Sequence, residues 1–142
     1  MEKVFDIYIR ATPEEVWEAV TTRQGDYSFP IPEEMQGEFA AGGRVEEDPP
    51  RRLVQTMKAN WSKEVAQEPE STITTEIEPW NDGMTHVRVT HSGLREGGSA
   101  EIWGGWPMIL SSLKSLLETG ESLNLRIPDE VVERWRAEKA TA

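Results

Sequence analysis

Apolar residues recur at steps of three and four between residues 100 and 120, which is the spacing of one buried face of an α-helix. The stripe consists of Trp103, Trp106, Ile109, Leu110, Leu113, Leu116 and Leu117. Pro107 has no amide hydrogen to donate, so we expect the helix either to kink there or to begin near Trp106. Gly120 follows the last apolar residue, where a left-handed C-terminal cap is expected. A helix with so broad an apolar face needs a large partner surface.

Alternating apolar and polar residues predict antiparallel strands before this helix. Residues 4–10 form a half-buried first strand. Residues 12–15 (TPEE) then predict the start of a short helix, because the threonine can cap it and the second glutamate completes a capping box. Farther along, residues 71–78 and 85–91 alternate on either side of residues 81–83 (NDG), a tight-turn sequence. We expect these two segments to pair as a hairpin.

The segments between the first helix and the hairpin are less regular. Residues 23–43 predict a loop with one short strand around 37–41, and this loop either closes over the core or forms a lid on a cavity. Residues 44–48 predict a short edge strand that two prolines end, and residues 51–59 predict a stronger strand. Residues 60–70 are polar and predict a turn or an exposed loop.

This order of elements predicts an α+β fold in which a curved antiparallel sheet wraps around the long C-terminal helix, with a short helix after the first strand. Residues 1–120 are expected to form this one domain. Residues 121–142 form a C-terminal extension, in which Val131, Val132 and Trp135 make a thin apolar stripe. This stripe predicts a short helix packed on the domain or on a partner.

Composition excludes several classes of partner. The formal net charge of −11 disfavours nucleic acid and anionic membrane surfaces, both of which require clustered cations. No apolar run approaches the roughly 18 residues that a membrane span needs, and the N-terminus lacks the apolar core of a signal peptide. The absence of cysteine excludes disulfides and a thiol nucleophile. A cytoplasmic location, without nucleic-acid or membrane partners, is expected.

Four sequence motifs resemble those of the Hsp90-ATPase-activator-homologue family. They are ATPEEVWEAV at 11–20, EEDPPRRLVQT at 46–56, VTHSGL at 89–94 and GGWPMILSSLKSLLETG at 104–120. This family belongs to the START-like, helix-grip superfamily, also called SRPBCC or Bet v 1-like. The resemblance implies a hollow between sheet and helix that accepts an apolar or amphipathic small molecule, and it implies no shared catalytic residue. The chain departs from the family in a short segment before DPPRRL and in its added tail.

Aromatic and apolar residues on the inward faces are the candidates for lining this hollow. They are Phe29, Met57, Trp61, Ile77, Val89, His91, Trp103, Trp106 and Leu110. Trp103 and Trp106 flank a Gly-Gly break where the helix can leave space, although packing in the core is the commoner role of such residues. His91 shares an apolar strand face and either serves a ligand or holds the Ser92–Gly93 turn.

No metal site, other cofactor or catalytic residue is predicted. His86 and His91 lie on opposite strand faces, and His86 is expected to be solvated. Neither Ser92 nor Ser99 has the glycines of a nucleophile elbow.

Three functions remain open. The first is a non-enzymatic binding domain for a small hydrophobic or amphipathic ligand. The second is an Hsp90 co-chaperone-like interaction module, for which the basic pair at 51–52 either meets a partner or pairs with the acidic residues at 46–48. The third is a cyclase-like or hydrolase-like enzyme that uses His91. A homodimer is also possible, through the tail stripe and an exposed edge of the hairpin.

Overall fold

The computed structural model describes residues 1–141, and for residues 36–42 it describes the backbone only. The elements in order are β1 (Lys3–Ile9), α1 (Pro13–Thr22), α2 (Gln24–Tyr27), the 3-10 helix η1 (Glu33–Glu38), β2 (Phe39–Asp48), β3 (Arg52–Ala59), α3 (Lys63–Ala66), β4 (Ser71–Trp80), β5 (Met84–Ser92), the 3-10 helix η2 (Ala100–Ile102), α4 (Trp106–Thr119) and α5 (Asp129–Ala140). This confirms the expected α+β helix-grip fold. No helix in the described part of the chain is long and apolar enough to cross a bilayer.

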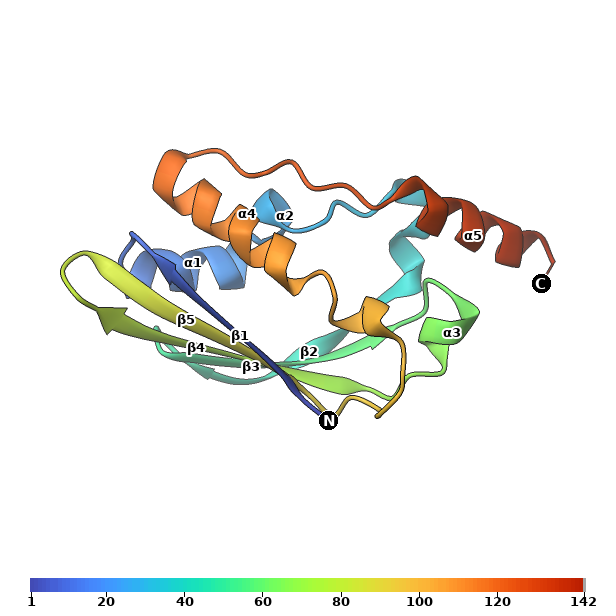
Figure 1. Ribbon diagram of the computed structural model, residues 1–142, viewed down its shortest axis with the longest axis horizontal. Coiled ribbons are helices and arrows are strands. Elements are labelled where there is room, and N and C mark those ends of the chain that lie inside the picture. Colours follow the sequence, from blue (N-terminus) through green and yellow to red (C-terminus); the bar gives the residue numbers. More distant parts are fainter. Residues whose placement is uncertain (142) are drawn as a thin grey trace.

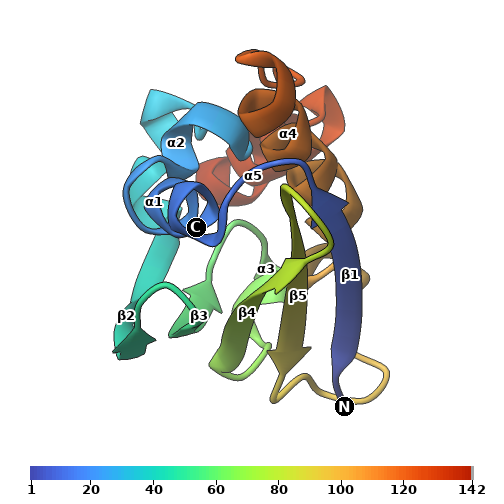
Figure 2. The same cartoon turned by 90° about the vertical axis from the view of Figure 1, so that its left-hand side faces the viewer.

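The strands form one antiparallel sheet in the order β1-β5-β4-β3-β2. Helices α1, α2 and α4 all lie on the same side of this sheet (Figures 1 and 2). The predicted β4–β5 hairpin is present, but it lies in the interior of the sheet, between β1 and β3. The expectation that its edge is exposed and available to a partner is therefore wrong; the edge strands are β1 and β2.

Helix α1 begins as its sequence predicts. Glu15 donates its backbone N–H to Thr12 Oγ1 at 3.1 Å, and Thr12 donates its own N–H to Glu15 Oε1 at 3.1 Å. These two bonds complete the capping box, so two of the amides at the start of the helix are satisfied within the chain.

Helix α4 begins at Trp106 and does not kink, which decides between the two expectations for this segment. Pro107 fits in the first turn, where no intrahelical amide bond is needed. Gly120 ends the helix with φ 85°, in the left-handed conformation that glycine adopts without strain. The buried face of α4 packs on the inner face of the sheet through Leu110, Leu113 and Leu116.

The free edge of β1 is partly covered by α4. Lys114 Nζ donates to the Tyr8 carbonyl at 2.6 Å, and the Arg10 amide donates to Glu118 Oε2 at 2.8 Å. Lys114 and Glu118 also pair with one another at 2.7 Å. One helical ion pair therefore occupies two backbone groups that an added strand would use.

A second apolar cluster lies beyond the end of the grip, under the tail helix α5. Its buried members are Met35, Ala59, Trp61, Val65 and Trp135. In Figure 1 the chain after α4 runs back over the molecule and places α5 near α3 and η1. The described part of the tail thus packs on its own chain.

The prediction of a turn or exposed loop at residues 60–70 is correct only in part. Most of the segment is exposed, but it contains the single-turn helix α3, and Val65 and Glu68 are buried. The polar composition of this segment does not indicate full exposure, because some of its polar side chains form hydrogen bonds within the protein. Ser62 caps α3, and Glu68 accepts from Arg95 and from the Ser99 amide, at 2.8 and 2.7 Å.

Candidate functional site

The space between α4 and the inner face of the sheet is almost filled by side chains. The void that remains has a volume of about 30 Å³, which is room for little more than a water molecule. We call it the grip cavity. It is lined by Val20, Gln24, Tyr27, Gln55, Thr75, Val87, Val89, Trp106, Ile109, Leu110 and Leu113.

The lining of the grip cavity divides into two walls of different polarity. Helix α4 and strand β5 supply a wall of aliphatic and indole side chains. Helix α2 and strands β3 and β4 supply uncharged polar groups. These are Gln24, Tyr27, Gln55 and Thr75. An enclosed space with one apolar side and one hydrogen-bonding side matches a molecule of the same divided polarity.

Local structure explains how the polar groups reach the cavity. Gln24 and Tyr27 lie three residues apart on the single turn of α2; Tyr27 is buried, whereas Gln24 is exposed and lies at the rim. Thr75 pairs in register with Leu53 and Val89, two buried residues of the inner sheet face. Gln55 lies two residues after Leu53 on β3 and therefore shares that face.

The hydrogen-bonding groups of this wall carry no charge. Burial raises the pKa of Tyr27, so its phenol keeps its proton at neutral pH. The exposed Gln24 at the rim donates its amide nitrogen to the Val20 carbonyl at 2.7 Å.

His91 is completely buried and connects the sheet to α4. Trp106 Nε1 donates to His91 Nδ1 at 3.1 Å. An indole nitrogen only donates, so the imidazole proton must sit on Nε2, which bonds Ser71 Oγ at 2.7 Å. Burial lowers the pKa of His91 to about 4, so the ring is neutral at neutral pH. His91 thus joins β5, β4 and α4, and the partners of its ring lie outside the Ser92–Gly93 turn.

The structure brings only some of the predicted lining residues to the grip cavity. Val89, Trp106 and Leu110 contact it. Ile77 packs in the same core. His91 lies behind Trp106, which separates it from the void. The role of these residues in binding a ligand stays a prediction.

The other predicted lining residues lie elsewhere. Phe29 packs at the start of α4, where a Cβ on Gly105 would come within 3.0 Å of its ring. The Trp103 ring lies under Lys3 Nζ, 4.3 Å from the ring centroid. Met57 and Trp61 belong to the second cluster, because β3 extends past the grip there.

Several residues that line the grip cavity were not among the predicted lining residues, although the sequence patterns indicated that some of them are buried. Ile109 and Leu113 are in the predicted helix stripe, and Val20 is in the predicted first helix. Gln55 and Thr75 alternate with apolar strand residues, but nothing local indicates that their polar groups meet Tyr27 across a cavity.

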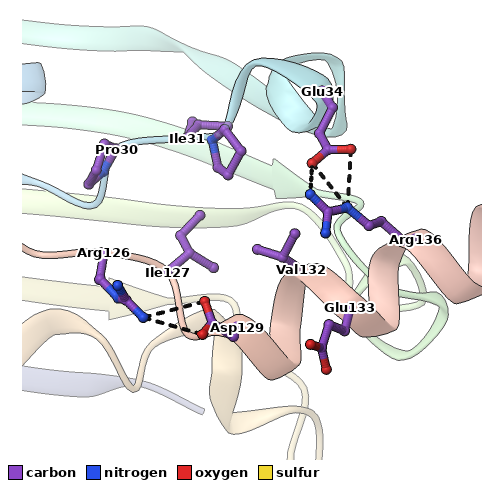
Figure 3. A pocket seen from close by; sticks show the side chains of 10 residues that line it. Pro30, Ile31, Glu34, Arg126, Ile127, Asp129, Val132, Glu133 and Arg136 are labelled. Atoms are coloured by element: carbon purple, nitrogen blue, oxygen red, sulfur yellow. Dashed lines mark hydrogen bonds and ion pairs between the residues drawn. The ribbon is translucent and has the colours of Figure 1, made fainter.

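A larger and more open hollow of about 460 Å³ lies between residues 30–34 and the tail. We call it the tail groove. Figure 3 shows Ile31, Ile127 and Val132 facing this hollow. Arg126 pairs with Asp129 at 3.3 Å, and Arg136 pairs with Glu34. Its charged groups are thus largely paired with one another, and it was not predicted.

The outer face of the sheet carries a row of alternating charges, one from each strand, in register. The row runs Asp6, Arg88, Glu76, Arg52, Asp48. Arg88 pairs with Asp6 at 2.8 Å, and Arg52 lies 3.5 Å from Glu76. Opposite charges on adjacent strands attract one another, so the two arginines of the row are each paired with a carboxylate of a neighbouring strand.

His86 adjoins this row and is not solvated, contrary to expectation. It is 8% exposed, and its ring stacks on Tyr8 with a centroid distance of 4.9 Å. Its Nδ1 bonds Glu78 at 2.8 Å and its Nε2 bonds Asp6 at 2.7 Å. Among the described residues, no group of three His, Cys, Asp or Glu residues has the arrangement of a metal site.

The basic pair at 51–52 is engaged within the chain. Arg51 pairs with Asp48 at 2.8 Å, and Arg52 bonds Glu46 at 3.3 Å. These contacts favour the interpretation in which the arginines neutralise the neighbouring acidic cluster.

Comparison with known proteins identifies a family that matches this chain. Residues 22–118 match the family model described as Activator of Hsp90 ATPase homolog 1-like protein. A search of curated proteins gave no match.

Several solved structures share the fold. CalU16 from Micromonospora echinospora is 21% identical with a TM-score of 0.66, over 98% of this chain and 86% of that one. The Aha1 dimer from Colwellia psychrerythraea is 22% identical with a TM-score of 0.64, over 86% and 99%. An HSP90 activator from Plasmodium falciparum is 20% identical with a TM-score of 0.55, over 75% and 87%. At these identities the likeness shows the fold alone.

Proposed function

Because the chain belongs to the Activator of Hsp90 ATPase homolog 1-like family, within the SRPBCC superfamily, we propose that it is a non-enzymatic domain that binds a small hydrophobic or amphipathic molecule in the grip cavity. The observation that carries this proposal is the divided lining of that cavity. A core that served packing alone would not need to gather an amide, a phenol and a hydroxyl, from Gln55, Tyr27 and Thr75, around one void.

Binding requires the grip cavity to expand. Small-molecule pockets are usually about 300–1,000 Å³, and the void has about 30 Å³. The single turn α2 and the irregular segment after it form one side of the mouth. Short elements of this kind are displaced at lower cost than the sheet or α4. We therefore propose that a ligand enters between α2 and the start of α4, where Phe29 rests on Gly105.

A fluorescent apolar probe tests the proposal. N-phenylnaphthylamine is expected to brighten on binding and to quench Trp106, which lines the cavity. Leu110→Trp fills the void and is expected to abolish the signal, whereas Leu110→Ala enlarges it and strengthens binding. Met108→Trp is the matched control, because Met108 is on the same helix and 49% exposed. Equal probe binding by Leu110→Trp and Met108→Trp would contradict a site in the grip cavity.

A second candidate is interaction with an Hsp90-type chaperone. It is supported by the family membership and by the activator title of the Plasmodium relative. The test is the affinity for purified Hsp90 of variants that lack Arg51 and Arg52. Arg126→Ala is the control, because Arg126 is also an exposed arginine in an i,i+3 ion pair. Loss of affinity with the pair at 51–52 but not with Arg126→Ala supports this candidate; no measurable affinity of the unaltered chain rejects it.

Catalysis through His91 is the weakest of the three functions. Both ring nitrogens already have protein partners, so no lone pair is free to take a proton from a substrate. We also propose residues 1–120 as the binding domain and 121–142 as an added extension.

A further inference from the structure

We infer that the ligand of the grip cavity is an uncharged molecule with an apolar body and a hydrogen-bonding end, such as an alcohol, phenol, ketone or amide, and that carboxylates, phosphates and alkylammonium ions are excluded. This inference rests on the proposed function and specifies the chemical class of its ligand. Three observations carry it.

The first observation is the lack of a counter-ion. Of the described residues that line the grip cavity, none is an acid, a lysine, an arginine or a histidine. An ionised group that enters such a space loses its hydration and gains no opposite charge. For a carboxylate or an ammonium this cost is far larger than for a hydroxyl that finds a hydrogen-bond partner.

The second observation is that the nearest ionisable rings supply no charge. Tyr27 stays protonated at neutral pH. His91 is neutral and has both nitrogens occupied, by Trp106 and Ser71. Neither ring can therefore become the cation that holds an anionic head group or the anion that holds an amine.

The third observation is the position of the polar groups. Tyr27, Gln55 and Thr75 come from α2, β3 and β4, whereas α4 and β5 supply apolar lining residues. Amides and hydroxyls supply both donors and acceptors. A hydroxyl or carbonyl at one end of the ligand can therefore be satisfied there while the rest of the molecule lies against α4 and β5.

Competition among three molecules of equal chain length tests the inference. Decanol, decanoate and decylammonium are each titrated against bound N-phenylnaphthylamine at neutral pH. Only the signal that Leu110→Trp removes is counted. Titrations are repeated at about 1 M salt, where the screening length is about 3 Å, so that the net charge of −11 neither attracts the amine nor repels the acid.

We expect decanol to displace the probe at a concentration about tenfold or more below that needed for either ion, at both salt concentrations. Equal or stronger displacement by decanoate or decylammonium overturns the inference, while the bound probe leaves the proposed function standing. Absence of any cavity-dependent probe binding overturns both together.

An isosteric charge change gives an independent readout. Gln55→Glu places a carboxylate in the lining and is expected to shift the preference toward decylammonium. Thr75→Asp, at a buried lining position on β4, makes a comparable change and replaces Gln55→Glu if that variant does not fold. An unchanged order of the three competitors in a folded variant contradicts the inference.

Discussion

His91 and His86 occupy opposite faces of β5, and their pKa values are shifted in opposite directions. The inner ring accepts a hydrogen bond from an indole and has no acid beside it, so its neutral form is favoured. The outer ring lies between two carboxylates, so its charged form is favoured. The surroundings of each imidazole therefore determine whether it is a neutral hydrogen-bonding group or a cation.

The pH dependence of stability should reveal the neutral state of His91. Its pKa is lowered from 6.5 to about 4, so the unfolded chain takes up a proton first as the pH falls. Stability is full above pH 6.5 and is lost progressively toward pH 4. Urea unfolding of the original chain should show this slope, and His91→Gln should be less stable and show a shallower slope below pH 6.5. An unchanged slope in the variant would contradict a buried neutral imidazole.

His86 should show the reverse dependence. Burial lowers its pKa, but the hydrogen bonds that the ring donates to the carboxylates of Glu78 and Asp6, together with their charges, outweigh burial, and the pKa is raised above 6.5. The stabilisation is complete below pH 6.5 and is lost as the pH rises through the raised value. His86→Gln should remove the decline in urea-unfolding free energy above neutral pH. The same decline in both proteins would show that other groups cause it.

At the scale of elements, the start of α4 is set by crowding in the turn before it. A Cβ on Gly104 would lie 2.8 Å from the Ala100 carbonyl oxygen, which is backbone and cannot move alone. The chain therefore passes from η2 to α4 through a glycine pair, and this places Trp106 over both the cavity and His91. The residues that fix the helix thus also position the cavity wall.

Gly104→Ala should destabilise the protein by about 1–3 kcal/mol, because the backbone of the turn must shift to admit the methyl group. Gly25→Ala is the matched control: it lies in α2 with open space around its Cβ, and alanine favours a helix by about 1 kcal/mol. Chemical denaturation measures both. Equal effects of the two substitutions would contradict a steric role for Gly104.

At the scale of the molecule, the chain has two apolar centres joined by β3. The first holds the grip together, and the second is completed by α5, whose Trp135 is 9% exposed. Val131 and Val132 of α5 also pack against this cluster, and the helix makes ion pairs such as Arg134 with Glu101 at 2.7 Å. The indole nitrogen of Trp135 is buried with no hydrogen-bond partner, which reduces the gain from docking the helix.

Trp135→Ala should therefore release α5 and leave the grip folded. Hydrogen exchange should accelerate over residues 129–140 while β4 and β5 stay protected. Trp135→Phe should retain the docked helix, because it keeps most of the apolar area and removes the unpaired donor. Loss of protection throughout the sheet in Trp135→Ala would show that the two centres fold as one unit.

Whether a feature could be predicted from the sequence depends on how far apart in the chain its interacting residues lie. Helix caps, the β4–β5 turn and the stripe of α4 depend on neighbours within four residues, and all were predictable. The burial of Glu68 depends on Arg95 and Ser99, which are distant in the chain. The polar wall of the cavity likewise assembles from α2, β3 and β4, so no local pattern could indicate it.

The ion pair that α4 presents to the edge of β1 limits how the sheet can propagate. Growth of an open-ended fibre by strand addition requires two usable edges on every subunit. Here Lys114 and Glu118 already hold the Tyr8 carbonyl and the Arg10 amide, and β2 is the other edge. Because this end of β1 is occupied, strand pairing through β2 is expected to favour two joined copies over a long fibre. Lys114→Ala combined with Glu118→Ala would free these groups and make the protein more prone to polymerise, which light scattering would detect.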